Sequence, residues 1–246
     1  MDKKVIKTGL IVHDLKNPLA IIEAGIISLI KREDKYGDLT EKQQRVLKRV
    51  LRNSKIAKML INDILEVGRS GAGVSEKKSF LISDFIKRPI VEILDLTDSE
   101  AAEKTGKCDN LDQLKDLLSG LNIIVKIDGD IWDQSVDLDE RKMLQILRNL
   151  LNNALKYRKQ KIELEVLKDD KSLRFSVCDD GQGIDESYHK QIFECYFQLD
   201  VQKEFCVRGH GLGLAGVQIL IEEMGGELSL ESGEKKGAKF SVNIPL

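Results

Sequence analysis

The chain has 246 residues, of which 41% are apolar, so it is long enough to fold as one large domain or two smaller ones around a real core. Its 39 lysines and arginines nearly balance its 41 aspartates and glutamates, which argues against nucleic acid or an anionic membrane as a partner. No apolar run reaches the length of a membrane span, about 18 residues, and no signal peptide is recognisable, so we expect a cytoplasmic protein whose four cysteines are reduced.

The first predicted helix runs to about Arg32. Its apolar residues alternate at spacings of four and three, which is typical of a heptad seam that packs against other helices. The seam consists of Leu15, Leu19, Ile22, Ile26 and Leu29.

The stretch HDLKNPLA, residues 13–20, places a histidine next to an acid in this helix. Since each residue advances about 100° around a helix, His13 lies about 160° from the centre of the seam and faces water. Asn17 lies one turn further along the same face, and Pro18 should bend the helix there. His13 could be an ordinary surface histidine. Alternatively it is a nucleophile towards phosphorus, with Asp14 accepting the ring proton, which requires a phosphoryl donor elsewhere in the chain.

A capping box from Thr40 to Gln43 predicts the start of a second helix, and we expect the two helices to form an antiparallel hairpin. The seam of the second helix consists of Leu47, Val50, Ser54, Ala57, Ile61 and Ile64. Because a two-helix hairpin cannot close a core alone, we expect a homodimer in which residues 10–68 of two chains form a four-helix bundle.

The pattern changes after this hairpin. Residues 71–78 are rich in glycine, serine and charge and have no periodicity, so they are predicted to link a helical domain, residues 1–70, to a second domain, residues 79–246. In the second domain, the stretches KIELEVL, LRFSVC, ELSLES and KFSVNIPL alternate as strands do, with helical stretches between them. This is typical of an α+β sandwich with helices covering one face of a mixed sheet. The helical stretches are 83–96, 139–157 and 213–224.

Residues 97–120 are polar, with a possible short helix after Asn110, and we interpret them as an insertion without an assigned function.

The helix predicted at 139–157 has one polar face, made of Lys142, Gln145, Asn149, Asn153 and Lys156. Such a face could simply be solvated, but solvated faces usually carry lysine and glutamate, and asparagine is a mediocre helix former. Two asparagines one turn apart therefore indicate a ligand. An amide oxygen suits Mg²⁺, and a lysine nearby suits the phosphates that share this ion.

The stretch VCDDGQGI follows a predicted strand. Gly181 and Gly183 would let the backbone approach a planar ligand, and Asp179 can accept a hydrogen bond from an exocyclic amine such as that of adenine. On its own, however, this D-x-G-x-G sequence could equally be a plain turn.

The stretch GHGLGLAG opens a helix, where free N–H groups and the helix dipole favour phosphate. It also fits the dinucleotide pattern G-x-G-x-x-G. That interpretation fails because no apolar strand leads into it and only 30 residues follow Gly216, too few to complete a doubly wound sheet. A Walker P-loop is absent from the sequence.

The order of these motifs resembles that of the cytoplasmic core of a two-component sensor histidine kinase. HDLKNPL resembles the H-box, NLLNNALKY the N-box, DDGQGI the G1 box, IFECYF the F-box and GHGLGL the G2 box, over residues 13–214. The resemblance implies a dimerisation and histidine-phosphotransfer hairpin joined to a Bergerat-type (GHKL) ATP-binding domain that uses ATP and Mg²⁺.

The resemblance also implies roles for single residues. His13 would be the phospho-acceptor, with Asp14 as its acid–base neighbour. Asn17 would position a water that dephosphorylates the aspartyl phosphate of a response regulator. In the nucleotide site, Asn153 would bind Mg²⁺, Lys156 phosphate and Asp179 adenine, with Tyr157 as a wall. The implied ATP-binding residues are Asn149, Asn153, Lys156, Tyr157, Asp179, Gly181, Gly183, Ile184, Gly209, His210, Gly211, Leu212, Gly213 and Leu214.

Residues 194–210 would form the ATP lid, and Phe193 and Phe197 are expected to pack the lid. His210 departs from the serine or threonine usual in the family. It could contact phosphate or simply face solvent, and we favour solvent.

The implied activity is autophosphorylation of His13 from ATP, followed by transfer to an aspartate of a response-regulator receiver domain, under control of an upstream sensor domain or protein. Two alternatives remain. A GHKL ATPase of the chaperone or mismatch-repair type would share the nucleotide motifs but has no reason to carry the hairpin. A degenerate kinase that acts as a dimeric scaffold is the alternative without enzymatic activity.

Overall fold

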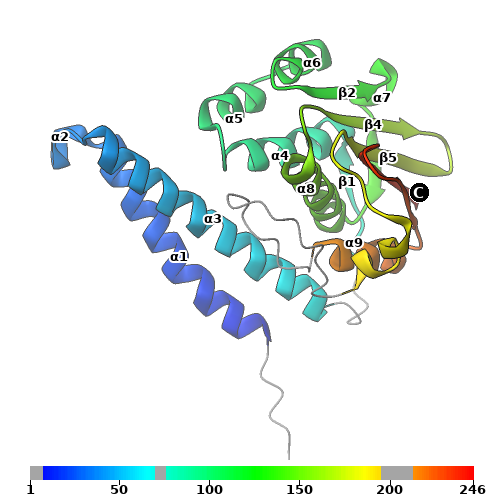
Figure 1. Cartoon of the computed structure of the whole chain (residues 1–246), viewed down its shortest axis with the longest axis horizontal. Coiled ribbons are helices and arrows are strands. Elements are labelled where there is room, and N and C mark those ends of the chain that lie inside the picture. The colour runs from blue at the N-terminus through cyan, green and yellow to red at the C-terminus, as the bar shows by residue number, and fades with distance from the viewer. Residues whose placement is uncertain (1–7, 70–75, 195–212) are drawn as a thin grey trace, which may run out of the picture. The chain divides into compact units, whose positions relative to one another are not determined.

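The computed structural model describes residues 8–69, 76–194 and 213–246 (Figure 1). The chain divides into two compact units, Met1–Arg69 and Ser70–Leu246.

The first unit is a helical hairpin. Helices α1 (Thr8–Lys31) and α3 (Glu41–Arg69) lie side by side, joined by the short helix α2 (Glu33–Tyr36), as Figure 1 shows. The capping box before α3 is confirmed: the Thr40 N–H donates to Oε1 of Gln43 at 2.9 Å, and the Gln43 N–H donates to Oγ1 of Thr40 at 3.3 Å. The predicted hairpin is therefore confirmed.

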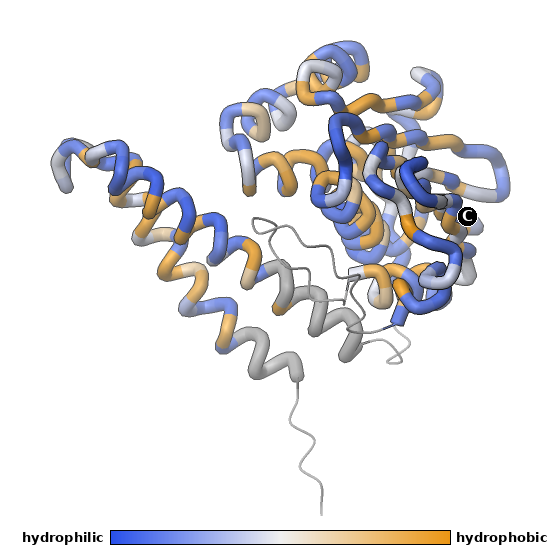
Figure 2. Tube along the Cα trace, viewed as in Figure 1, coloured by the Kyte–Doolittle hydropathy of each residue, from blue (hydrophilic) through white to orange (hydrophobic). Residues whose placement is uncertain are grey.

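The hairpin buries only part of its apolar surface within one chain. Ile26 is buried between the helices, and the hydroxyl of the buried Ser54 donates to the carbonyl oxygen of Leu19 at 3.3 Å. By contrast, Leu15 and Ile22 are 47% and 44% exposed, and Figure 2 shows apolar positions continuing along the described part of both helices. The two helices thus leave apolar surface that a single hairpin cannot cover.

The second unit contains a five-stranded mixed sheet in the order β2-β4-β5-β7-β6, in which only the β2–β4 pair is parallel. The four predicted strands are confirmed to within one residue at each end, whereas β1, β2 and β3 were not predicted. The strands are β1 (Lys78–Leu81), β2 (Ile123–Ile127), β3 (Ser135–Leu138), β4 (Ile162–Lys168), β5 (Ser172–Asp179), β6 (Glu227–Ser232) and β7 (Ala238–Pro245). Strands β1 and β3 form a separate antiparallel pair.

The three predicted helices are also confirmed, as α4 (Ile82–Leu94), α8 (Glu140–Tyr157) and α9 (Gly213–Glu223). They pack with one another and with the sheet to close the core (Figure 1). The strands can pack against the helices because apolar and more polar residues alternate along them. In β5, Leu173, Phe175 and Val177 are buried, and the residues between them are more polar. The expected α+β sandwich is confirmed. The shorter helices are α5 (Ser99–Gly106), α6 (Leu111–Ser119), α7 (Gly129–Trp132), η1 (Glu186–Tyr188) and η2 (Gln191–Phe193).

Residues 97–120, interpreted from the sequence as a polar insertion, also contribute to the core. Asp98 and Asn110 cap α5 and α6 by accepting backbone N–H groups at 3.0 and 2.9 Å. The helix expected after Asn110 is therefore present, and its Leu114 and Leu118 are fully buried. Apolar residues spaced three or four apart are enough to anchor an otherwise polar segment.

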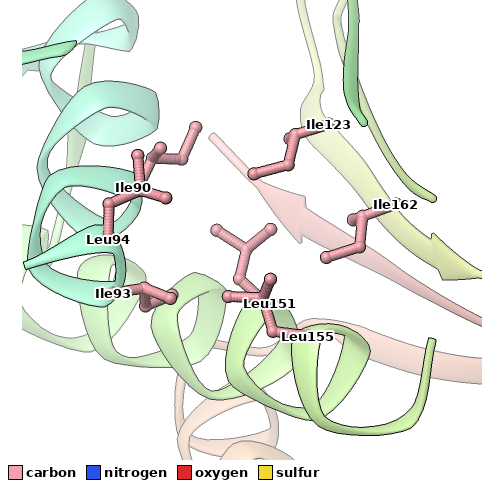
Figure 3. A pocket seen from close by; sticks show the side chains of 7 residues that line it. All are labelled: Ile90, Ile93, Leu94, Ile123, Leu151, Leu155 and Ile162. Atoms are coloured by element: carbon pink, nitrogen blue, oxygen red, sulfur yellow. The ribbon is translucent and has the colours of Figure 1, made fainter. Parts of the chain in front are cut away.

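A small apolar cavity lies between α4, α8 and the first two strands of the sheet (Figure 3). Its volume is about 10 Å³, close to the minimum for one water molecule, and no polar group lines it. It is therefore a packing defect rather than a ligand site. The lining residues are Ile90, Ile93, Leu94, Ile123, Leu151, Leu155 and Ile162.

Within the described ranges, none of the helices is both long enough and apolar enough to cross a membrane.

Candidate functional site

The predicted phospho-acceptor stretch lies on α1. Asp14 and Asn17 are exposed, as expected for Asn17 from the helical geometry, and Ala20 one turn further on is exposed too. The helix continues through Pro18. The side chain of His13 itself lies outside the described residues.

Helix α8 carries the predicted polar face, and the structure divides this face into two parts. At its start, Nζ of Lys142 pairs with Oε2 of Glu223 in α9 at 2.8 Å. Two turns on, Asn149 is only 6% exposed, and its Nδ2 donates to the carbonyl oxygen of Gly213 at a long 3.5 Å. This part of the face therefore holds α9 against α8, a role that the sequence analysis did not assign.

Asn153 lies one turn beyond Asn149, and its side chain is half-buried. Its amide oxygen is the type of hard donor that Mg²⁺ takes. The described residues contain no group of three or more histidine, cysteine, aspartate or glutamate side chains that could hold a metal. A single amide oxygen nevertheless fits Mg²⁺, because this ion usually retains waters and is held mainly by the phosphates of its substrate.

Lys156 and Tyr157 end the helix and contact each other. Nζ of Lys156 donates to the hydroxyl of Tyr157 at 2.9 Å and lies 4.7 Å from the centre of its ring. Tyr157 is exposed, and Lys156 is half-buried. The lysine would have to leave this contact to bind a phosphate.

The last residue of β5, Asp179, carries the carboxylate predicted to recognise adenine. Asp179 is 7% exposed, and its Oδ1 accepts the N–H of Gly181 at 2.8 Å. Burial raises the pKa of Asp179, although hydrogen bonds from the backbone N–H groups of Gly181 and Ala238 oppose this rise. A buried acceptor is thus fixed at the end of the strand.

The two glycines of the loop after β5 are needed for close approach. A Cβ atom on Gly181 would overlap the carbonyl oxygen of Tyr157, and one on Gly183 would overlap that of Gly233. Gly183 also has a φ of +77°, which side chains rarely adopt. The loop is therefore packed between the end of α8 and the turn that joins β6 to β7.

The sequence analysis missed Asp180, which ties this loop to the residues that follow α8. Its Oδ1 accepts three consecutive backbone N–H groups, those of Lys159, Gln160 and Lys161, at 2.9, 3.0 and 3.1 Å. Burial acts to raise the pKa of Asp180, but these N–H groups outweigh it and the pKa lies below its ordinary value. Aspartate commonly caps backbone N–H groups in this way, and the doubled acid of DDG was the available signal.

The segment after the loop leads towards the expected lid. Ile192 is buried, and the ring of Phe193 packs edge-on against Phe240 of β7, with centroids 6.4 Å apart. Of the expected lid, only Glu194 is described. Phe197, Gly209, His210, Gly211 and Leu212 lie outside the described residues.

Three further predicted residues are placed. Gly213 opens α9, while Leu214 and Ile184 are partly buried against the core.

Comparison with known proteins identifies both units. Residues 9–73 match the His Kinase A (phospho-acceptor) domain, and residues 138–246 match the histidine kinase-, DNA gyrase B- and HSP90-like ATPase domain.

Curated relatives match almost the whole chain. The circadian input-output histidine kinase CikA of Synechococcus elongatus is 30% identical over 235 residues, which are 95% of this chain and 29% of CikA. The adaptive-response sensory kinase SasA of Crocosphaera subtropica is 28% identical over 250 residues, covering 97% of this chain and 58% of SasA. The chain thus spans less than two thirds of the length of these relatives.

The crystal structure of full-length ShkA in complex with AMPPNP has the same fold over 97% of this chain and 45% of its own, with a TM-score of 0.62 and 24% sequence identity. Given the two matched domains and these relatives, the chain belongs to the histidine kinases and contains their catalytic core, a phospho-acceptor domain followed by an ATP-binding domain.

Proposed function

We propose that this protein is an ATP-dependent histidine kinase that phosphorylates itself on His13. The observation that carries the proposal is the buried carboxylate of Asp179, held in a glycine loop beside α8 in a chain that also presents Asp14 and Asn17 on an exposed helix face. A GHKL ATPase without phosphotransfer would use the carboxylate of Asp179, but it has no need for the exposed helix face that carries Asp14 and Asn17.

The reaction requires few groups from the protein. A nitrogen of the His13 imidazole attacks the γ-phosphorus of ATP, a nitrogen–phosphorus bond forms, and the bond from phosphorus to the β,γ-bridging oxygen breaks, so that ADP leaves. Asp14 accepts the proton from the imidazole ring and orients the ring. Phosphoryl transfer depends mostly on alignment and charge neutralisation.

The nucleotide would be held by residues of the second unit. Asp179 accepts the exocyclic amine of adenine, Tyr157 borders the nucleotide, and Lys156 leaves its contact with that tyrosine to meet the phosphates. The residues that open α9, Gly213 and Leu214, offer backbone N–H groups to phosphate. Asn153 would hold Mg²⁺, which neutralises phosphate charge when bound.

The active form is proposed to be a homodimer through residues 10–68. Support comes from the apolar residues that stay exposed on the hairpin, such as Leu15 and Ile22, and from the phospho-acceptor family. An upstream sensor domain or protein would provide the input, in keeping with the much greater length of the relatives.

The phosphoryl group is proposed to pass from His13 to an aspartate on the receiver domain of a response regulator. Asn17, which is exposed and follows His13 by four residues in α1, would position a water that removes this group from the regulator.

Incubation with labelled ATP and Mg²⁺ tests the proposal. The expected product is a protein label that is labile to acid and stable to base, mapped by mass spectrometry to the peptide containing His13. The His13→Gln variant is the matched control, because it keeps the other two histidines of the chain, His189 and His210. Release of phosphate without protein label would indicate an ATPase instead, and neither product would indicate a scaffold.

A mixing experiment tests the dimer and the direction of the reaction. His13→Gln subunits retain the nucleotide site, and Asn153→Ala subunits retain the phospho-acceptor. If the two variants exchange and the label appears on the Asn153→Ala subunit, each site phosphorylates its partner. If mixing restores no label although the subunits exchange, each chain phosphorylates itself.

A further inference from the structure

Five residues, one from each strand, form a single row across the large sheet. The register pairs run from Ile123 to Ile162, Asp179, Ala238 and Ser232. The first four are buried on the face that the helices cover. The row thus places Ser232, at the end of the edge strand β6, two strands away from the carboxylate proposed to recognise adenine, with only the small Ala238 between them.

The hydroxyl of Ser232 makes two hydrogen bonds. It accepts the backbone N–H of Ile184 at 2.8 Å and donates to the carbonyl oxygen of Gly237 at 2.7 Å. The assignment is unambiguous, because an N–H can only donate and a carbonyl can only accept, so the single hydroxyl proton must go to Gly237. Ser232 therefore bridges the end of the Asp179 loop and the end of the β6–β7 turn.

The Asp179 loop and the β6–β7 turn are tightly packed against each other. A Cβ atom on Gly237 would overlap the carbonyl oxygen of Asp179, and Gly237 has a φ of +74°. The Lys235 N–H of the turn also donates to the carbonyl oxygen of Gln182 in the loop. A change in the turn would therefore be transmitted directly to the backbone that carries Asp179.

We propose that Ser232 is a positioning residue that fixes the Asp179 loop and thereby sets the preference of the site for adenine over guanine; this inference rests on the proposed nucleotide-binding function. A carboxylate accepts the exocyclic amine of adenine but opposes the carbonyl oxygen that guanine carries in the equivalent place. Discrimination of this kind depends on an accurately placed carboxylate. Ser232 does not contact the base in this proposal and acts through Ile184 and Gly237.

The test compares Ser232→Ala with Ser229→Ala. Ser229 lies on the same strand but is exposed, so its loss removes a hydroxyl without touching the loop. ADP and GDP affinities would be measured by calorimetry, together with melting temperatures. We expect Ser232→Ala to weaken ADP binding by on the order of tenfold, which corresponds to about 1.4 kcal/mol. GDP binding should weaken much less, so that the ratio of ADP affinity to GDP affinity falls. Ser229→Ala should match the wild type.

Two further variants guard against an unfolded Ser232→Ala protein. Ser232→Thr keeps a hydroxyl and should restore most of the preference for ADP. Ser232→Cys keeps nearly the same shape with a weak hydrogen-bonding group and should lose that preference.

A lower melting temperature with an unchanged ADP to GDP ratio in Ser232→Ala or Ser232→Cys would overturn the proposal, since a merely structural residue behaves in this way. A wild-type protein that binds neither nucleotide would instead reject the proposed function itself.

Discussion

Asp179 holds the backbone of Gly181, two residues further along the same loop, through a hydrogen bond of 2.8 Å from the glycine N–H to Oδ1. The bond folds the loop back on the buried carboxylate and presents the acceptor at the end of β5. Because burial raises the pKa of this carboxyl, its charge, and with it the proposed contact to adenine, should depend on pH above the usual range for aspartate.

This dependence predicts opposite effects of pH on stability and on binding. Since the folded state holds the Asp179 proton more tightly than the unfolded state does, its contribution to stability is full below about pH 3.8 and is lost as the pH rises through the raised pKa. ADP affinity should change the other way and fall as the pH drops through that pKa. Urea unfolding and ADP titration of the wild type and Asp179→Asn across this range measure both effects. A difference in stability between the two proteins that does not vary with pH would contradict the assignment.

The adjacent acids Asp179 and Asp180 should have separable roles. Asp179→Asn should weaken ADP by tenfold or more with little change in melting temperature, because the carboxylate's proposed partner is the ligand. Asp180→Ala should do the reverse and cost about 1–3 kcal/mol of unfolding free energy, because three backbone N–H groups lose their acceptor. Equal losses of affinity in both variants would show that the two acids act only as one structural unit.

Asn149 and Asn153 should also differ, although they lie one turn apart on α8. Asn153→Ala should abolish autophosphorylation in a folded protein by removing the proposed Mg²⁺ ligand. Asn149→Ala should mainly loosen the start of α9, because the amide of Asn149 donates to Gly213, and should lower the unfolding free energy by about 1 kcal/mol. Labelling rates and melting temperatures of the two variants provide the check. A normal labelling rate in Asn153→Ala would show that Asn153 is not the Mg²⁺ ligand.

Asn17→Ala should separate the two activities proposed for α1. The amide lies about 6 Å from the histidine position along the helix face, beside the path of phosphoryl transfer, so His13 labelling and transfer should remain substantial. Dephosphorylation of the phosphorylated regulator should be mostly lost. Both rates and the melting temperature should be measured on one preparation. A parallel fall in all three would mean that Asn17 merely stabilises the helix around Pro18.

The apolar cavity predicts a strong response to truncation of its lining. Ile162→Ala should destabilise the protein by about 2–5 kcal/mol, because Ile162 is fully buried and the new space adds to an existing cavity. Ile124 on the neighbouring strand β2 is 38% exposed and offers the control, since Ile124→Ala should cost much less. Urea denaturation monitored by the fluorescence of the single tryptophan, Trp132, measures both. Similar losses for the two variants would contradict the packing.

Local patterns in the sequence were enough to predict several parts of this protein. The heptad spacing and the Thr40–Gln43 capping box predicted the hairpin, and alternation predicted four strands to within one residue. The order of motifs indicated the family, because each motif is a short contiguous stretch whose chemistry can be read without knowing its neighbours in space.

The folded structure was needed to show which distant residues contact one another. Helix packing and strand register bring together residues that are far apart in the sequence. In this way Asn149 contacts Gly213, Asp180 accepts hydrogen bonds from the N–H groups after α8, and Ser232 lies in one row with Asp179. Such pairings join residues that are about 20 to 60 positions apart, and a hydrogen-bonding side chain carries no local signal of its partner. The chemistry of the site was therefore legible in the sequence, while the contacts that position it depend on how the sheet and helices pack.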